Sequence, residues 1–88
     1  MPTISEFFGL SIYMYNNGSE HNPPHFHVFY GNDECVIDIK KCKITKGKMP
    51  KSKERLLLAW CEIHKDELLQ NWEFAIKNME LKKIAPLS

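Results

Sequence analysis

The chain has 88 residues, of which 43% are hydrophobic and three are cysteine. A chain of this length removes only about 60–65% of its unfolded surface from water, which predicts one domain over residues 1–88 and excludes an enzyme with a deep interdomain cleft. The apolar content excludes a disordered chain. The net charge of +1 is unevenly divided, with −5 in residues 1–39, +7 in residues 40–55 and −1 in residues 56–88.

The cellular location is predicted from cysteine usage and hydropathy. An odd number of widely spaced cysteines, Cys35, Cys42 and Cys61, indicates a reducing compartment rather than a disulfide framework. No apolar run approaches the roughly 18–20 residues of a membrane-spanning helix, and the first nine residues carry no basic side chain of an export signal. We therefore expect a cytoplasmic protein without membrane contact.

The first predicted element is a short helical turn. Residues 3–6 read Thr-Ile-Ser-Glu, which fits a capping box, so the turn would run through Phe7 and Phe8 and end at Gly9. Residues 10–15 then alternate between two sets of side chains, which predicts a half-buried strand followed by a turn over residues 16–19.

Residues 25–30 and 35–39 predict a β-hairpin around Gly31 and Asn32. Period-two burial favours a two-residue loop, because this register puts the apolar side chains of both strands on one face. In that register Val28 faces Cys35 and His25 faces Asp38, with His27 beside His25 on the second face.

The C-terminal half predicts helices after a short strand near residues 43–45. Apolar residues from 57 to 79 follow helical spacing, and Trp60, Trp72 and His64 are expected in the core or at its boundary. We favour two helices bent near residues 65–66, with Asp66 as a new N-cap, over one long helix, and a tail over residues 82–88. The predicted fold class is α+β: a three- to four-stranded antiparallel sheet, followed by a C-terminal helical hairpin or one long bent helix packed on one face.

Three of the four histidines lie in a histidine box, residues 21–27. His25 and His27 share one face of the predicted strand, about 6.5–7 Å apart at Cα. Together with a carboxylate they could bind a divalent transition metal such as Zn, Ni or Mn, or perform acid–base chemistry; hydrogen bonding in a purely structural role is the third alternative. The candidate metal ligands are Glu20, His21, His25, His27 and Asp38, and the candidate catalytic residues are His25, His27 and Asp38.

The basic stretch, residues 40–55, is a candidate surface for nucleic acid or an acidic partner. The alternative is a solvated loop and helix start, because seven of its eight bases are lysines rather than bidentate arginines. The candidate nucleic-acid-binding residues are Lys40, Lys41, Lys43, Lys46, Lys48, Lys51, Lys53 and Arg55.

The second face of the predicted sheet is unusually aromatic for a solvent-facing surface. Exposed aromatic patches usually mark interaction sites, so Tyr13, Tyr15 and Phe29 are candidate interface residues. We expect this face to bind a partner or to form a homodimer.

Six groups of residues, spread along essentially the whole chain, form a recognisable series. They are Met1-Pro2-Thr3-Ile4-Ser5, Ile12-Tyr13-Met14-Tyr15, His21-Asn22-Pro23-Pro24-His25-Phe26-His27, Val36-Ile37-Asp38-Ile39, Gly47-Lys48-Met49-Pro50, and Trp60, His64, Glu67-Leu68-Leu69 and Asn71-Trp72. Together and in this order they resemble domain-of-unknown-function family 4160. The resemblance implies a small prokaryotic cytosolic protein whose partner is encoded by a neighbouring gene, in a toxin–antitoxin-like pair; it implies no reaction.

The sequence therefore predicts a non-enzymatic interaction module that binds a protein partner and, through residues 40–55, nucleic acid. The alternative is a metal-binding or acid–base, ribonuclease-like site built on the histidine box with Asp38. Little depth is available in 88 residues for a water-excluding active site, which favours the first prediction.

Overall fold

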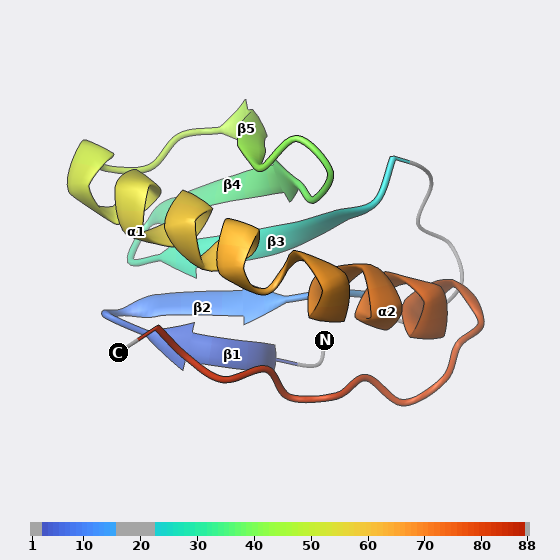
Figure 1. Ribbon diagram of the computed structural model, residues 1–88. Helices are drawn as coiled ribbons and strands as arrows, with labels where there is room; N and C mark the ends of the chain where they lie inside the picture. The colour runs from blue at the N-terminus through green and yellow to red at the C-terminus, as the bar shows by residue number, and fades with distance from the viewer. Residues whose placement is uncertain (1–2, 16–22, 88) are drawn as a thin grey trace.

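The computed structural model describes residues 3–15 and 23–87 of the chain (Figure 1). It is an α+β fold, in which a five-stranded antiparallel sheet precedes two helices. The predicted class is confirmed, but the predicted three to four strands are too few. The elements are β1 (Thr3–Phe7), β2 (Leu10–Tyr13), β3 (His25–Tyr30), β4 (Asp33–Asp38), β5 (Lys43–Gly47), α1 (Lys51–Ile63) and α2 (Lys65–Ile76).

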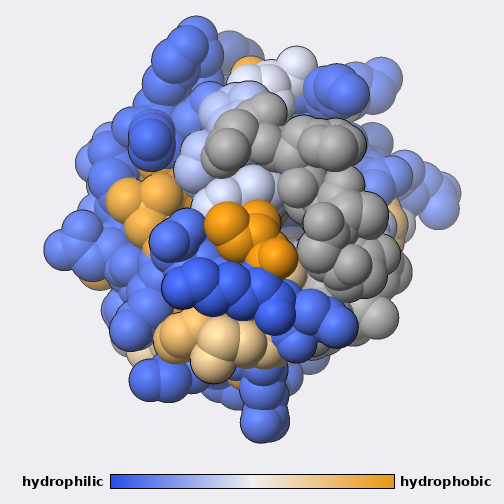
Figure 2. Space-filling model, turned by 90° about the vertical axis from the view of Figure 1, so that its right-hand side faces the viewer, coloured by the Kyte–Doolittle hydropathy of each residue, from blue (hydrophilic) through white to orange (hydrophobic). Residues whose placement is uncertain are grey.

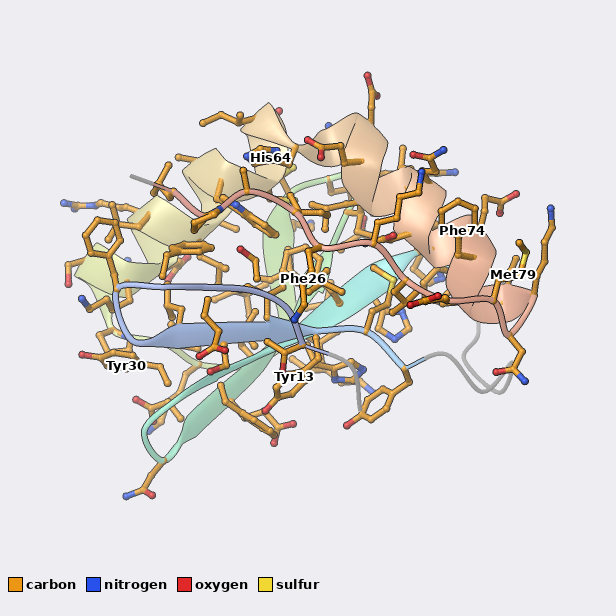
Figure 3. The ribbon with its side chains drawn as sticks, turned by 90° about the horizontal axis from the view of Figure 1, so that it is seen from below. Tyr13, Phe26, Tyr30, His64, Phe74 and Met79 are labelled. Atoms are coloured by element: carbon orange, nitrogen blue, oxygen red, sulfur yellow. The ribbon has the colours of Figure 1, made fainter. Side chains whose placement is uncertain are left out.

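The sheet is a meander in which each strand pairs with its neighbours in the sequence, in the order β1-β2-β3-β4-β5. Both helices lie on one face (Figure 1). Seen from below, Phe26 points toward the helices and Tyr13 lies on the opposite side, which we call the second face (Figure 3). No helix among the described residues has the length and apolarity needed to cross a membrane.

The β3–β4 hairpin has the predicted register. Val28 pairs with Cys35, Phe26 with Ile37, and His25 with Asp38. The first four of these side chains are at most 1% exposed, as period-two burial requires. The short strand expected near residues 43–45 is β5.

The helical turn predicted at the start of the chain is wrong, because these residues form β1. The strand pairs with β2 and buries Ile4 and Phe7, a gain in hydrogen bonds and apolar burial that a single capping box does not match. Phe8 and Gly9 both have positive φ, 49° and 80°, as in the tight turns that join antiparallel strands.

The helical region divides into two helices at His64, which separates α1 from α2. The preference for two helices is confirmed, but the N-cap of α2 is His64 rather than Asp66. Asp66 instead lies in the first turn with Glu67, whose carboxylate accepts a hydrogen bond from His64 Nδ1 at 2.6 Å.

The apolar stripe predicted to continue through Ile76 and Met79 is wrong, since these side chains are 39% and 50% exposed. The Asn78 N–H donates to the Ala75 carbonyl and the Met79 N–H donates to the Phe74 carbonyl, the bonds of a Schellman motif. Asn78 has a φ of 57°, a conformation that asparagine tolerates, so the helix ends without a glycine.

The main core lies between the helices and the first face of the sheet. Trp60 is its largest fully buried side chain, with ring centroids of Phe7 and Phe26 at 5.2 and 5.9 Å. The other buried helical residues of this core are Leu57, Cys61, Leu68, Trp72 and Ala75, which pack with Leu10, Ile12, Met14, Phe26, Val28, Cys35 and Ile37 of the β-region.

The C-terminal segment, residues 81–87, is packed rather than the predicted tail. Its Ile84 is 4% exposed, and the Ile84 N–H donates to the carbonyl of Ile4 at 2.9 Å. The indole Nε1 of Trp60 donates to the carbonyl of Ala85 at 2.9 Å. The segment therefore lies along the outer edge of β1 (Figure 1).

Asn71 binds the backbone of the C-terminal segment, and we expect Asn71→Ala to undock residues 81–87 from the domain. The Asn71 side chain is almost fully buried; it donates to the Lys82 carbonyl at 2.8 Å and accepts from the Lys82 N–H at 3.0 Å. Loss of both bonds should lower the free energy of unfolding by about 1–3 kcal/mol and accelerate amide exchange at Ile84. Gln70→Ala, at the exposed neighbouring position, is the control; equal exchange at Ile84 in both variants would contradict the assignment.

All three cysteines are buried free thiols. The Cys42 thiol donates to the Cys61 sulfur at 3.0 Å, which joins the turn after β4 to α1. Burial raises the pKa of Cys42, raises the pKa of Cys35 from 9.0 to about 11, and raises the pKa of Cys61 further. Buried thiols with raised pKa values are poor nucleophiles.

These raised thiol pKa values predict that alkali weakens the fold. The contribution of the neutral thiols is fully present below the pKa of 9.0 of an exposed thiol and is lost toward the folded-state value, about 11 for Cys35. In that window the unfolded chain releases thiol protons that the folded chain retains, so the free energy of unfolding falls by up to about 1.4 kcal/mol per pH unit for each thiol. Urea unfolding at pH 8 to 10 measures this slope. Cys35→Ala should make it shallower, and equal slopes in the two proteins would contradict the prediction.

Candidate functional site on the second face of the sheet

Rings line the second face in pairs that cross the strands. Tyr13 and Phe29 have ring centroids 4.8 Å apart, and Tyr15 and His27 have centroids 4.5 Å apart. His25 and His27 follow along β3, with centroids 5.3 Å apart. β2, the two residues that follow it and β3 thus bring the two tyrosines, the phenylalanine and two of the box histidines onto one surface.

The members of this surface differ in exposure. Tyr13 is only 8% exposed, and burial, followed by the charges of Tyr15 and Glu34, raises the pKa of its hydroxyl. Tyr15, His27 and Phe29 are half-buried. Of the three candidate interface residues, Tyr15 and Phe29 therefore offer surface to a ligand, whereas Tyr13 is buried beside the ring of Phe29.

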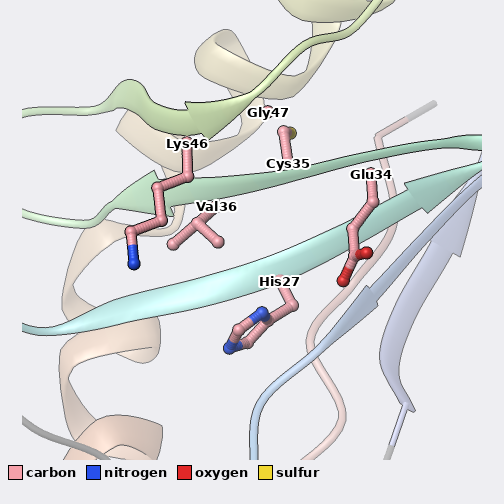
Figure 4. A pocket seen from close by; sticks show the side chains of 6 residues that line it. All are labelled: His27, Glu34, Cys35, Val36, Lys46 and Gly47. Atoms are coloured by element: carbon pink, nitrogen blue, oxygen red, sulfur yellow. The ribbon is translucent and has the colours of Figure 1, made fainter.

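An open pocket of about 310 Å³ lies beside these rings, across β3, β4 and β5. Figure 4 shows the side chains of His27, Glu34 and Lys46 pointing to the same side of the sheet. An imidazole, a carboxylate and an ammonium group thus lie around one pocket. The lining residues are His27, Glu34, Cys35, Val36, Lys46 and Gly47.

A close backbone approach between β4 and β5 forms one wall of this pocket. Gly47 has a φ of 78°, and a Cβ at this position would overlap the carbonyl oxygen of Glu34. The β4–β5 register shifts between Val36 and Ile37, so Lys43 and Lys46 both pair with residues of the second face. This irregularity is what brings Lys46 beside His27.

The imidazole of His25 contacts a backbone carbonyl and an aromatic ring, which fix its orientation. Its Nδ1 lies 2.9 Å from the Pro23 carbonyl, which can only accept, so Nδ1 donates this hydrogen bond. Its ring also lies 5.0 Å from that of Trp72 on α2. The proline pair of the histidine box thus orients the imidazole at the start of β3.

Asp38 faces His25 in the register, as predicted, but its carboxylate also has a structural partner. Its Oδ1 accepts a hydrogen bond from the Lys41 N–H at 3.0 Å, and its carbonyl accepts from the Cys42 N–H at 2.7 Å. Asp38 therefore holds the turn between β4 and β5.

Residues 3–15 and 23–87 contain no group of three His, Cys, Asp or Glu side chains placed to hold a metal ion. Two predicted ligands, Glu20 and His21, lie outside the described residues. Within the described part, His25 and His27 are the members of the histidine box that the structure brings together.

The basic stretch follows one border of the molecule, from the β4–β5 turn along β5 to the first turns of α1. Seven of its eight bases are exposed, whereas Lys53 is half-buried, with its ammonium group 5.9 and 5.3 Å from the ring centroids of Phe8 and Tyr30. The end of the molecule where α2 ends is largely hydrophilic among its described residues, with small separate apolar patches (Figure 2).

Sequence reasoning missed Glu34, Val36 and Gly47 as lining residues. The hairpin register alone places Val36 opposite His27 and Glu34 opposite Phe29, so these two could have been found from it. Gly47 could not have been found from the sequence, because its place in the pocket wall depends on the irregular β4–β5 pairing.

The fold and the site define a small α+β protein that keeps helices on one face of a sheet and an aromatic surface with a pocket on the other. The chain belongs to the family described as domain of unknown function (DUF4160), whose profile matches residues 9–73. The matched residues span β2 to β5, α1 and most of α2, and include every residue of the pocket. No curated protein and no solved structure matches the chain.

Proposed function

We propose that this protein is a non-enzymatic interaction module that binds a protein partner through the second face of its sheet. The observation that carries the proposal is the group of half-buried rings, Tyr15, His27 and Phe29, on the face of the sheet opposite the two helices (Figures 1 and 3). Aromatic side chains contribute strongly to protein interfaces because each covers a large area at low entropic cost. The pocket provides a recess beside them for a partner side chain.

An interaction role suits the chemistry of the site better than catalysis does. The pocket is open to solvent, so its charged groups are screened by water rather than held in a low-dielectric enclosure. Cys35 is among the lining residues, but its thiol is buried in the core, and burial raises its pKa to about 11. Neither feature favours a reactive centre.

The partner that we propose is the product of a neighbouring gene, in a toxin–antitoxin-like or regulatory pair. Native mass spectrometry of the two co-expressed proteins should show a complex of defined stoichiometry and also reports homodimers and bound metal. Tyr15→Ser combined with Phe29→Ser should weaken this complex at least about tenfold, since aromatic interface anchors contribute about 2 kcal/mol or more.

Ile63→Ser is the matched control, because Ile63 is an apolar side chain of α1 that is 65% exposed. It should leave the complex intact. No complex, or equal weakening by the control and the aromatic variant, would overturn the proposal.

Nucleic acid is the additional ligand predicted for the basic stretch. Each phosphate neutralised on duplex DNA should contribute about −0.9 to the slope of log affinity against log salt concentration. Binding to duplex DNA at increasing salt measures the slope. An affinity that changes neither with salt nor with Lys-to-Glu substitutions would contradict nucleic-acid binding.

The second candidate function is a metal-binding or acid–base, ribonuclease-like site. The observation that favours it is the pair of imidazoles, His25 and His27, at 5.3 Å, with Lys46 lining the same pocket as His27. Protein prepared with Zn, Ni or Mn should then retain metal, or should cleave RNA in a manner that His25→Ala plus His27→Ala abolishes. Metal-free, inactive protein would remove this candidate.

A further inference from the structure

The two edges of the sheet differ in what lies beside them. The outer edge of β1 is accompanied by the C-terminal segment, whose Ile84 N–H bonds to the Ile4 carbonyl. β5 ends the sheet on the other side, and no further strand of the described residues pairs with it. All residues of β5 except the half-buried Ile44 are exposed. Figure 1 shows β5 at this border of the sheet.

An exposed antiparallel edge offers hydrogen-bonding groups as well as side chains. Along such a strand, alternate residues direct their N–H and C=O groups away from the paired neighbour. These outward groups are a template for one more extended strand. β5 therefore presents main-chain donors and acceptors to any extended segment that reaches it.

The charges along this edge limit which segment can bind. Residues 39–53 contain seven lysines and no acid. The exposed Lys43 and Lys46 both pair with second-face residues of β4, so they project on that same face. Like charges opposite each other destabilise strand pairs, whereas opposite charges stabilise them. A second copy of β5 would be repelled, and an acidic strand would be attracted.

The two sides of β5 also define the pattern of the added strand. Its residues on the second face would lie beside Lys43 and Lys46, which suits glutamate or aspartate. Its residues on the other face would lie beside Ile44, which packs at the edge of the core and suits an apolar side chain. The matching sequence is thus an alternation of acidic and apolar residues.

We propose that the outer edge of β5 binds an extended acidic segment of the partner protein as a sixth strand. This inference rests on the proposed function, because it assumes a protein partner, and it assigns that partner a second contact besides the aromatic face. A peptide fits the edge better than nucleic acid does, because only a peptide pairs with the outward main-chain groups. The lysines also lack the bidentate geometry of arginine toward phosphate.

The probe is a labelled peptide of about seven residues in which glutamate alternates with valine, titrated with the purified protein by fluorescence polarisation. We expect binding, with slower amide exchange within residues 43–47. A peptide that is N-methylated at alternate residues keeps the charge but loses its donors on one edge. It should bind at least about tenfold more weakly, because strand addition depends on main-chain hydrogen bonds.

The variant Lys43→Glu with Lys46→Glu should bind the unmodified peptide at least about tenfold more weakly, because its edge no longer attracts the glutamates. Lys77→Glu with Lys82→Glu, two exposed lysines away from β5, is the charge-matched control and should bind normally. If the N-methylated and the unmodified peptide bind equally well, charge attraction alone explains the binding, and the proposal is overturned. Tighter binding of single-stranded DNA of equal charge, unaffected by the β5 variant, would also overturn it. Because this titration uses the chain alone, its failure is distinguishable from the failure of partner binding in co-expression.

Discussion

Replacement of Trp60 by alanine is expected to lower the free energy of unfolding by about 3–5 kcal/mol. The Trp60 side chain is fully buried and touches both layers of the fold, with the rings of Phe7 and Phe26 on the sheet side. A domain of this size has a total stability of only about 5–10 kcal/mol, so roughly half of it would be lost. Thermal and urea unfolding, followed by circular dichroism, measure the change.

Trp60→Phe separates the two roles of this side chain. Phenylalanine keeps most of the ring contacts but cannot donate to the Ala85 carbonyl, as the indole N–H does. We expect a smaller loss of about 1–2 kcal/mol, with faster amide exchange confined mainly to residues 81–87. If Trp60→Ala costs no more than Trp60→Phe, the ring contacts contribute little and the account of the core is wrong.

The second large effect is expected for Gly47→Ala, which should lower the free energy of unfolding by more than about 2 kcal/mol. An alanine at a φ of 78° costs roughly 1–2 kcal/mol by itself. Its Cβ would also overlap the Glu34 carbonyl oxygen and lie 2.9 Å from the Cys35 Cα, so β5 must move away from β4. Urea unfolding gives the total loss, and amide exchange in β5 locates it.

Gly31→Ala is the matched control for this prediction. Gly31 also has a positive φ, 58°, but a Cβ there would meet no atom within 4 Å. The difference between the two variants therefore isolates the overlap from the backbone conformation. Equal losses would show that β5 does not depend on the close approach at Gly47.

The parts of the fold that the sequence predicts are those controlled by neighbouring residues. The β3–β4 register follows from alternation around Gly31 and Asn32, and the same register places His25 and His27 together on the second face. The residues of the aromatic surface could therefore be named in advance. Their exposure could not, because the burial of Tyr13 depends on how Phe29 packs against it.

The errors concern elements whose state depends on distant residues. The residues from Thr3 to Glu6 are compatible with both a capped helical turn and a strand. Pairing with β2 is what makes them a strand. Whether residues 81–87 pack on the domain or form a free tail depends on their hydrogen bonds to the Asn71 side chain and the Ile4 carbonyl. No local pattern around Ile84 reports either contact.

The contact between Ile4 and Ile84 also has a consequence for folding. Every strand of the meander pairs with a neighbour in the sequence, so the sheet can form hairpin by hairpin as a nascent chain lengthens. An intermediate in which residues 81–87 have not yet docked therefore has two open sheet edges. Such an intermediate can pair with other chains through β1, where no row of lysines prevents it. Losses during refolding should therefore increase with protein concentration until the C-terminal segment has docked.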